Sequence, residues 1–403
     1  MSIKKRISII GTVGLPAKYG GFETLTAHLV DNLADKHDIT VYCSSKKYSK
    51  EERLSTYKGA KLKYIPLNAN GIQSIPYDTL SILRSLFNSD ILLILGVAGA
   101  WILPFVRLFT SKKIIISIDG IEWKREKWNI LAKLYLRWAE KMAVKYSHAD
   151  ISDNESIQDY TAMRYGSVST VIEYGADHTM QVKPNLKDIA NYPFLADDYA
   201  FKVCRIEPEN NVHMVLNAFS KRPDIKLVMV GNWDINTYGK TLKDKYASCE
   251  NIILFDPIYD QRTIDLLRSN AKLYVHGHTA GGTNPSLVEA MYLGLPIISY
   301  GVSYNRTTTE NRAIYFKSEV QLLEQLDSIT LQRLNKVAQD MKEIADKRYT
   351  WALIADKYNF LFNEVYASKG KTRIQPLTEN ISEDDLAELH VSHLKNSKLI
   401  FER

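Results

Sequence analysis

The chain has 403 residues, enough for two ordinary domains, and 45% of them are hydrophobic and 24% charged, as in a soluble globular protein. Its net charge of +6 is too small to indicate a nucleic-acid-binding protein, although it suits an anionic ligand or surface. The three cysteines lie far apart and form no CxxC pair, which makes a poor disulfide framework and favours a reducing compartment such as the cytoplasm.

One uncharged stretch, from Ile91 to Val106, raises the question of a membrane helix. It is about two residues shorter than the ~18 that a spanning helix needs, and Gly96, Gly99 and Pro104 interrupt it. We therefore predict a buried strand, a glycine loop and the start of a helix. The amino terminus has an apolar run that ends in glycines, so it predicts a first strand and no signal peptide.

Short apolar runs alternate with helical patterns along the first half of the chain, and the alternation then restarts. The expected strands are Arg6–Ile10, Ile39–Tyr42, Lys63–Ile65, Ile91–Leu95, Ile114–Ile118, Asp150–Ser152, Ser169–Ile172, Tyr199–Cys204, Lys226–Val230, Ile252–Leu254, Leu273–Val275 and Pro296–Ser299. The expected helices are Thr24–Ala34, Thr79–Asn88, Trp128–Tyr146, Ser156–Arg164, Asn211–Ser220, Thr263–Asn270 and Ser286–Leu293. This order predicts an α/β protein with two parallel, doubly wound sheets, each binding ligand at the carboxyl ends of its strands.

The polar segment from Met180 to Phe194 contains two prolines and no clear period, so we predict the linker there. Ser382 and Asp385 form a capping-box pattern for a short helix near the end of the chain. The expected parts are a first domain over 1–182, a second over 183–349, a helix over 350–367 that packs back toward the first domain, and a polar tail over 368–403.

The loop from Gly11 to Glu23 follows the first expected strand. Its glycines would let the backbone approach a ligand closely, and the start of the next helix attracts phosphate. The loop lacks the GxGxxG spacing of a dinucleotide site, and Pro16 stands where that helix would begin. A glycine loop without a ligand is the alternative interpretation.

Two aspartates, Asp119 and Asp153, are expected at neighbouring strand ends. A carboxylate in this place can orient an acceptor hydroxyl or accept its proton. Each also precedes a helical pattern, so the alternative role is helix capping.

A glycine-rich loop leads from His276 to a helix expected to open at Ser286, with Glu289 in its first turn. The backbone amides of Ser286 and Leu287 would bind a diphosphate, and Glu289 would accept hydrogen bonds from ribose hydroxyls. Arg205 ends the first strand of the second half, where a forked cation suits a diphosphate. The alternatives are a dipole-complementing Glu289 and a surface salt bridge of Arg205.

Together these loops resemble glycosyltransferase family 4, a retaining family with the GT-B fold, over about Ile7 to Tyr366. The resemblance implies two Rossmann-like domains that face a central cleft. It also implies that the donor site contains Gly20, Gly21, Glu23, Arg205, His278, Gly281, Gly282, Thr283, Asn284, Ser286, Leu287 and Glu289.

Within that family, six motifs are similar to those of bacterial rhamnosyltransferases of cell-wall and capsular polysaccharide assembly: GLPAKYGGFET, DGIEWKR, RIEPENN, VGNW, DPIYD and GHTAGGTNPSLVEAM. The resemblance implies dTDP-β-L-rhamnose as donor and a polyprenyl-diphosphate-linked sugar as acceptor, with several members forming a β-1,4 link to GlcNAc or glucose. By motif position, the catalytic aspartates would be Asp119 and Asp153.

Two positions depart from the broad family pattern. The first glutamate of Glu-x7-Glu is replaced by Gly281, and the lysine five residues after the family's arginine is replaced by Asn210. The missing glutamate normally contacts donor-sugar hydroxyls, so its loss argues against UDP-glucose and fits a 6-deoxy sugar. The missing lysine leaves the diphosphate charge to Arg205, the helix amides and His278.

The resemblance also implies front-face attack, with the departing diphosphate helping to take the acceptor proton. Arg205 and the helix start at Ser286 would stabilise the leaving charge. Asp197-Asp198 and Asp384-Asp385 lie away from the donor loops, so we expect no required metal.

The helix region Trp123–Tyr146 interleaves seven basic residues with Trp123, Trp128 and Trp138. This pattern suits an interfacial helix on anionic lipid, and an ordinary half-buried helix is the alternative. With a lipid-linked acceptor, we expect peripheral association with the inner face of the cell membrane. The sequence leaves the oligomeric state open, a homodimer included.

Other functions remain as alternatives. The second expected strand ends in Cys43-Ser44-Ser45-Lys46 without an acid for an NAD ribose, which leaves an NADP-dependent oxidoreductase. A sugar-nucleotide epimerase or hydrolase would turn over donor without acceptor. Two further alternatives are a glycosyltransferase that uses a UDP-sugar donor and a non-catalytic protein that binds a sugar nucleotide or a lipid-linked sugar.

Overall fold

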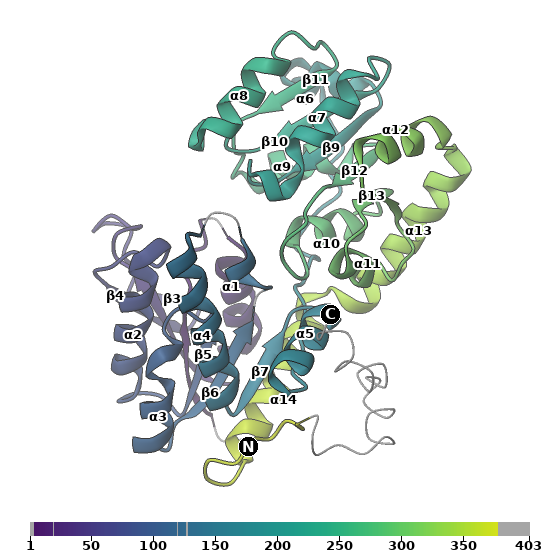
Figure 1. Cartoon of the computed structure of the whole chain (residues 1–403). Coiled ribbons are helices and arrows are strands. Elements are labelled where there is room, and N and C mark those ends of the chain that lie inside the picture. The colour runs from purple at the N-terminus through teal and green to yellow at the C-terminus, as the bar shows by residue number, and fades with distance from the viewer. Residues whose placement is uncertain (1–3, 19, 119, 126–127, 378–403) are drawn as a thin grey trace. The chain divides into compact units, whose positions relative to one another are not determined.

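The computed structural model describes residues 4–18, 20–118, 120–125 and 128–377 (Figure 1). They divide into two compact units. Unit 1 contains the residues up to Glu173 together with those from Trp351 onward, and unit 2 runs from Tyr174 to Thr350. Unit 2 therefore begins before the boundary predicted at residue 183. The tail helix predicted near Ser382 lies outside the described residues.

Unit 1 is built on an eight-stranded sheet in the order β3-β4-β2-β1-β5-β6-β7-β8, parallel except between β3 and β4. The central strands are continuous apolar runs because helices cover both faces of a parallel sheet. The strands are β1 Arg6–Ile10, β2 Asp38–Ser44, β3 Thr56–Tyr57, β4 Ala60–Ile65, β5 Ile91–Leu95, β6 Lys113–Ile118, β7 Ala149–Ser152 and β8 Thr170–Val171.

The helices of unit 1 are α1 Gly21–Leu33, α2 Ser74–Ser85, α3 Leu103–Phe109, α4 Ile130–Tyr146, α5 Glu155–Tyr165 and α14 Trp351–Ala367, with 3-10 turns η1 Gly71–Gln73, η2 Ala100–Ile102 and η3 Glu122–Lys124. The predicted strand, glycine loop and helix start within Ile91–Val106 are confirmed as β5, the following glycine loop and α3. Across the described residues, every helix is too short or too polar to cross a membrane.

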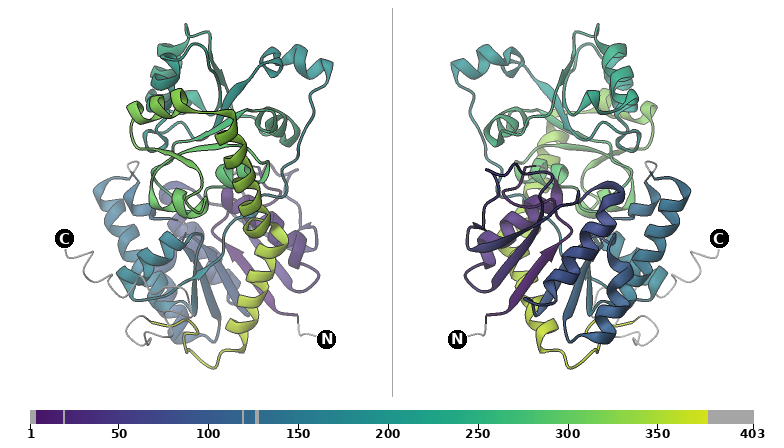
Figure 2. Two further views of the ribbon diagram at one scale, coloured as in Figure 1. Left: turned by 90° about the vertical axis from the view of Figure 1, so that its right-hand side faces the viewer. Right: turned by 90° about the vertical axis from the view of Figure 1, so that its left-hand side faces the viewer.

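Helix α14, the last helix described, packs against α1, the first (Figure 2). The rings of Trp351 and His28 stack with centroids 4.2 Å apart. Asn359 Oδ1 lies 2.8 Å from His37 Nε2, and Asn363 Oδ1 accepts from Lys5 Nζ at 2.5 Å. The face of α14 toward α1 is apolar and buried, so unit 1 is completed by residues distant from its sheet in the sequence.

Unit 2 has a six-stranded, wholly parallel sheet in the order β11-β10-β9-β12-β13-β14. Its strands are β9 Tyr199–Val203, β10 Lys226–Val230, β11 Ile252–Phe255, β12 Leu273–His276, β13 Ile297–Tyr300 and β14 Ile314–Phe316. Its helices are α6 Leu186–Asn191, α7 Val212–Ser220, α8 Thr237–Tyr246, α9 Gln261–Ser269, α10 Pro285–Tyr292, α11 Ser303–Thr308, α12 Glu319–Ser328 and α13 Leu331–Arg348, with 3-10 turns η4 Pro193–Ala196, η5 Pro208–Asn210 and η6 Trp233–Ile235.

The strand order reverses direction beside β1 in unit 1 and beside β9 in unit 2. In open parallel sheets, ligands bind outside the carboxyl ends of the strands at such switch points. The loops that follow β1, β9 and β12 are therefore the places to look for a site, and they contain most of the residues that the sequence singles out.

The segment predicted as a linker, Met180–Phe194, contains helix α6 instead of irregular chain. Asn185 and Asp188 form a capping box, in which each side chain accepts from the other residue's backbone amide at 2.9 and 3.1 Å. Arg262 then holds the Asp188 carboxylate with two hydrogen bonds of 2.7 and 3.0 Å. The prolines and polar composition suggested a linker, but the capping box starts a helix within it.

Asp78 on α2 is a buried acid without an ion-pair partner among the described residues, and burial raises its pKa to about 8. The unfolded chain releases this proton near pH 4, so unfolding becomes easier as the pH rises from about 4 to about 8. We expect Asp78→Asn to be more stable than the wild type at pH 8, by at least about 1 kcal/mol, and the gain to shrink toward pH 4. Urea unfolding at both pH values measures it. Asp35→Asn, at an exposed position, is the control and should show no such trend.

Candidate functional site

The loop after β1 is closed by Glu23, which lies in the first turn of α1 and is buried. Its Oε1 accepts from the amide of Val13 at 2.6 Å and from the hydroxyl of Thr12 at 3.1 Å. Burial raises the pKa of Glu23 more than these hydrogen bonds lower it. Gly20 has φ of 125°, and a Cβ there would lie 1.9 Å from Glu23 Oε2. Gly20 and Glu23 thus shape this loop with Gly21 at the helix start, and their donor contact stays a prediction.

Of the two predicted catalytic aspartates, Asp119 lies outside the described residues and Asp153 follows β7 in a buried position. Helix α5 is capped by Asn154, whose side chain accepts from the amide of Ser156 at 2.9 Å. The alternative role of Asp153 as the helix cap is therefore wrong. Asp153 directly follows a strand end, the position from which a carboxylate is expected to orient an acceptor hydroxyl. Its catalytic role stays a prediction.

Arg205 follows β9 at the switch point of unit 2, and its side chain is exposed. Among the described residues no side chain pairs with its guanidinium, so the alternative of a surface salt bridge finds no support. Asn210, at the position of the family lysine, is buried and donates from Nδ2 to the Arg205 carbonyl at 2.7 Å. Asn210 thus fixes the backbone turn that presents Arg205.

The glycine-rich loop after β12 includes Gly281, Gly282 and Thr283. The backbone conformation at its tip determines which residue can stand there. Gly281 has φ of 132° with open space around it, so conformation and not crowding requires glycine there. Thr283 is buried. The ring of His278, also buried, stacks on that of His276 with centroids 4.2 Å apart.

Asn284 caps helix α10 and occupies both amides that the sequence assigned to a diphosphate. The Ser286 amide donates to Asn284 Oδ1 at 3.2 Å, and the Leu287 amide donates to the Asn284 carbonyl at 3.0 Å. The Ser286 hydroxyl also donates to Asn284 Oδ1, at 2.8 Å. A donor diphosphate would have to replace Asn284 at these atoms, and the donor contact of the two amides stays a prediction.

Glu289 lies in the second turn of α10, and not in the first as predicted, because the helix begins at Pro285. Its carboxylate pairs with Arg268 Nη2 at 2.6 Å and with His178 Nε2 at 3.4 Å. Burial, the largest single effect, raises the pKa of Glu289, but the charges and hydrogen bonds of Arg268 and His178 together lower it, and the net shift is downward. A buried cation therefore keeps Glu289 ionised. This ion pair is a different role from the alternative, in which Glu289 only complements the helix dipole.

Arg268 itself is missed by the sequence analysis. It lies on α9, is only 3% exposed, and also approaches Asp265 Oδ1 at 3.6 Å. Of its two acidic partners, Asp265 lies one turn earlier on the same helix, whereas Glu289 comes from α10 and cannot be identified as a partner from a local motif.

Lys202 is a second missed cation. It lies within β9, is fully buried, and its ammonium has no hydrogen-bond partner among the residues described. Its Nζ lies 3.0 Å from the position of a Cβ built on Gly277, at the start of the glycine-rich loop. The ring nitrogens of neighbouring His276 are equally unpartnered in the described part of the chain. Burial lowers the pKa of both Lys202 and His276.

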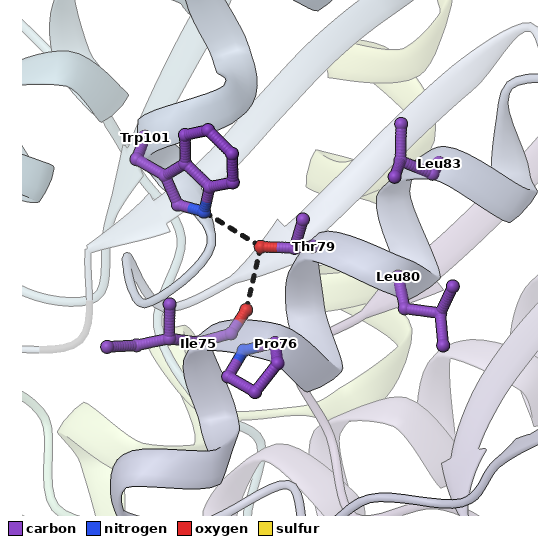
Figure 3. A pocket seen from close by; sticks show the side chains of 6 residues that line it. All are labelled: Ile75, Pro76, Thr79, Leu80, Leu83 and Trp101. Carbon is purple, nitrogen blue, oxygen red and sulfur yellow. Dashed lines mark hydrogen bonds between the residues drawn. The ribbon is translucent and has the colours of Figure 1, made fainter.

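A different hollow, an open apolar groove in unit 1, contains none of the predicted site residues. It is lined by Ile75, Pro76, Thr79, Leu80, Leu83 and Trp101 (Figure 3). Trp101 Nε1 donates to Thr79 Oγ1 at 2.8 Å, which satisfies the polar atoms of this wall. The groove therefore offers little to a charged donor. Within the described ranges, no three His, Cys, Asp or Glu side chains gather as metal ligands would.

Two family matches divide the chain at nearly the same place as the structure. Residues 4–177 match the family described as "Domain of unknown function (DUF1972)", and residues 189–348 match the family described as "Glycosyl transferases group 1". Each match covers less than half of the chain. No curated protein matches it.

Solved structures resemble the chain over most of its length. Sucrose-phosphate synthase from Thermosynechococcus elongatus has a TM-score of 0.77 at 14% identity, over 90% of this chain and 100% of that one. Anabaena HepE in complex with UDP and glucose has a TM-score of 0.69 at 15% identity, over 89% and 99%. The catalytic domain of starch synthase IV from Arabidopsis thaliana, bound to ADP and acarbose, has a TM-score of 0.67 at 12% identity, over 91% and 100%. At these identities the likeness shows the fold alone, and it confirms the predicted fold class.

Proposed function

We infer from the family match of unit 2 and from the fold that the chain is a GT-B glycosyltransferase with a nucleotide-sugar donor, and we propose that it transfers L-rhamnose from dTDP-β-L-rhamnose. The acceptor that we propose is a GlcNAc or glucose on a polyprenyl diphosphate, in cell-wall or capsular polysaccharide synthesis. The observation that carries a diphosphate donor is Arg205, an exposed cation at the switch point of unit 2 that has no ion-pair partner among the described residues.

In this proposal unit 2 binds the donor. Arg205 contacts the diphosphate, with His278 and the buried charge of Lys202 close to the loop that covers it. Glu289 accepts from ribose hydroxyls, since Arg268 keeps it ionised and fixes its orientation. Gly281 replaces the glutamate that the family resemblance assigns to donor-sugar hydroxyls, and this replacement supports a 6-deoxy sugar.

The proposed reaction breaks the bond between the sugar's anomeric carbon and the diphosphate and forms one to the acceptor oxygen on the same face. The acceptor proton passes to the leaving diphosphate. Cationic groups that face this leaving charge lower the barrier because the charge develops in the transition state. We propose that Arg205 does this without a metal ion, and that Asp119 and Asp153 orient the acceptor.

A thermal-shift titration tests the donor. Ligand that binds only the folded protein raises its melting temperature, by the equivalent of about 2.7 kcal/mol at a hundredfold excess over Kd. We expect dTDP-L-rhamnose to raise the melting temperature, and UDP-glucose and UDP-GlcNAc to leave it unchanged. A shift with a UDP-sugar alone would keep the glycosyltransferase and refute rhamnose as the sugar. Turnover of donor in the absence of any acceptor would favour the epimerase or hydrolase alternative.

A further inference from the structure

Helices α3 and α4 pack against each other in unit 1 (Figure 1). Both expose large apolar side chains. On η2 and α3 these are Trp101, Phe105, Leu108 and Phe109, which are 36–74% exposed. On α4 they are Ile130, Leu131, Leu134 and Trp138, which are 47–73% exposed. We call these eight side chains the α3–α4 face. So many large apolar side chains on neighbouring elements exceed what a monomeric surface normally leaves in water, and such patches mark interaction sites.

Basic residues of α4 border the α3–α4 face. The outward stripe of α4 begins with Leu131, Leu134 and Trp138 and continues with Lys141 and Lys145, each three or four residues apart. Arg137 is exposed beside them. The one acid of α4, Glu140, is buried and accepts from the Tyr160 hydroxyl at 2.5 Å.

A further cation comes from the segment after α14. Exposed Lys371 donates from Nζ to the carbonyl of Leu108, at 2.7 Å, and so stands at the end of α3. The apolar groove of Figure 3 shares Trp101 with the α3–α4 face and extends it toward α2. The result is an apolar surface with basic residues at its edge.

The tryptophans chosen from the sequence explain this surface only in part. Trp123 is turned inward and donates to the Tyr160 hydroxyl at 2.9 Å, and Trp128 donates to Glu122 Oε1 at 3.0 Å. Only Trp138 of the three belongs to the exposed face, so the surface that could meet a membrane is set by α3 and the first half of α4.

We propose that the α3–α4 face inserts into the headgroup region of an anionic lipid bilayer. Apolar side chains with basic residues at their edge are the combination that binds such surfaces. The apolar side chains are buried in the bilayer, and the basic residues are attracted to lipid phosphate. A second copy of the chain fits less well, because it would bring its own basic residues to the same face. The inference does not depend on which sugar the enzyme transfers.

Vesicle co-sedimentation of the full chain tests the proposal. We expect binding to vesicles containing phosphatidylglycerol and none to pure phosphatidylcholine. The combined variant Leu108→Ser, Phe109→Ser, Leu131→Ser and Leu134→Ser should bind at least about tenfold more weakly, since it removes the buried apolar area. Arg137→Gln with Lys141→Gln and Lys145→Gln should weaken binding and remove most of its salt dependence. The matched control is Val320→Ser with Leu331→Ser, which alters exposed apolar residues of unit 2 and should bind as the wild type does.

Absence of wild-type binding to anionic vesicles overturns the proposal, and so does an equal loss in the matched control. A wild-type dimer that becomes monomeric in the serine variant, without vesicle binding, assigns the face to a second copy instead. The thermal shift with nucleotide sugar is read on the same variants. A normal shift together with lost vesicle binding separates a failure of the membrane surface from a failure of the proposed donor.

Discussion

Replacing Arg268 by methionine should destabilise unit 2 by about 3–5 kcal/mol, the usual loss when one partner of a buried ion pair is removed. Arg268 is the buried cation between Glu289, 2.6 Å away, and Asp265, 3.6 Å away. Methionine fills much of its volume but leaves both carboxylates without a compensating charge. Urea unfolding monitored at a probe within unit 2 measures the loss.

The matched control is Arg262→Met on the same helix. Arg262 pairs with Asp188 at 2.7 Å, but half of its side chain is exposed, so solvent screens the pair and its loss should be within about 1 kcal/mol. Adding Glu289→Gln to Arg268→Met should restore part of the stability. Equal losses for Arg268→Met and Arg262→Met would contradict the buried role of Arg268.

The same pair predicts a pH dependence. The folded pKa of Glu289 is below its ordinary value, so the pair stabilises the fold above the unfolded pKa of about 4.3 and loses that contribution as the pH falls through the folded pKa. The difference between the wild type and Arg268→Met should therefore be full at pH 7 and shrink on acidification below about pH 4.

Replacing Lys202 by methionine should have two opposite effects, and their combination is diagnostic. A buried, unpaired ammonium costs folding free energy, so Lys202→Met should raise the melting temperature of the free protein. If Lys202 supplies charge beneath the loop that covers the donor diphosphate, the same variant should bind dTDP-L-rhamnose more weakly. We expect at least a tenfold rise in Kd, equivalent to about 1.4 kcal/mol.

Arg205→Ala provides the comparison, because Arg205 is exposed and forms no ion pair within the part of the chain that the structure describes. It should leave the melting temperature of the free protein unchanged and lower turnover by about 10²–10³-fold, the usual effect of removing a group that stabilises transition-state charge. Lys226→Met, at a partly exposed lysine of β10 that pairs with Asp197, is the control for loss of a strand lysine. A more stable Lys202→Met protein with unaltered donor affinity would show that Lys202 takes no part in binding.

The sheet cores follow from the sequence because their signal is local. Strands β1 and β5 coincide with their predicted bounds, since each is an apolar run that ends at a glycine. The elements without a prediction have weaker local signals. Strand β3 has two residues and is largely exposed, and α8 is a polar helix that Asn236 starts by accepting from the Gly239 amide at 2.8 Å.

The site is harder to predict because its key contacts are tertiary. Glu289 could be selected from its loop, but its partner Arg268 lies on α9, and a tertiary ion pair of this kind cannot be found from spacing. The amides of Ser286 and Leu287 can be selected from the start of the helix, and the structure adds that both donate to Asn284. Lys202 did have a visible signal, since a lysine inside the otherwise apolar strand YAFKV is unusual for a buried sheet.

The packing of α14 on α1 has a consequence for synthesis on the ribosome. The sheet of unit 1 has been translated by Glu173, but the helix that covers α1 begins only at Trp351. At about 5–20 residues per second, translation of the intervening unit takes roughly 10–35 s. During this time the apolar surface of α1 is exposed to solvent in the nascent chain. Unit 2 is continuous and can fold in that interval. We therefore expect unit 2 to mature first although it is translated second, with the earlier unit dependent on chaperones until α14 emerges.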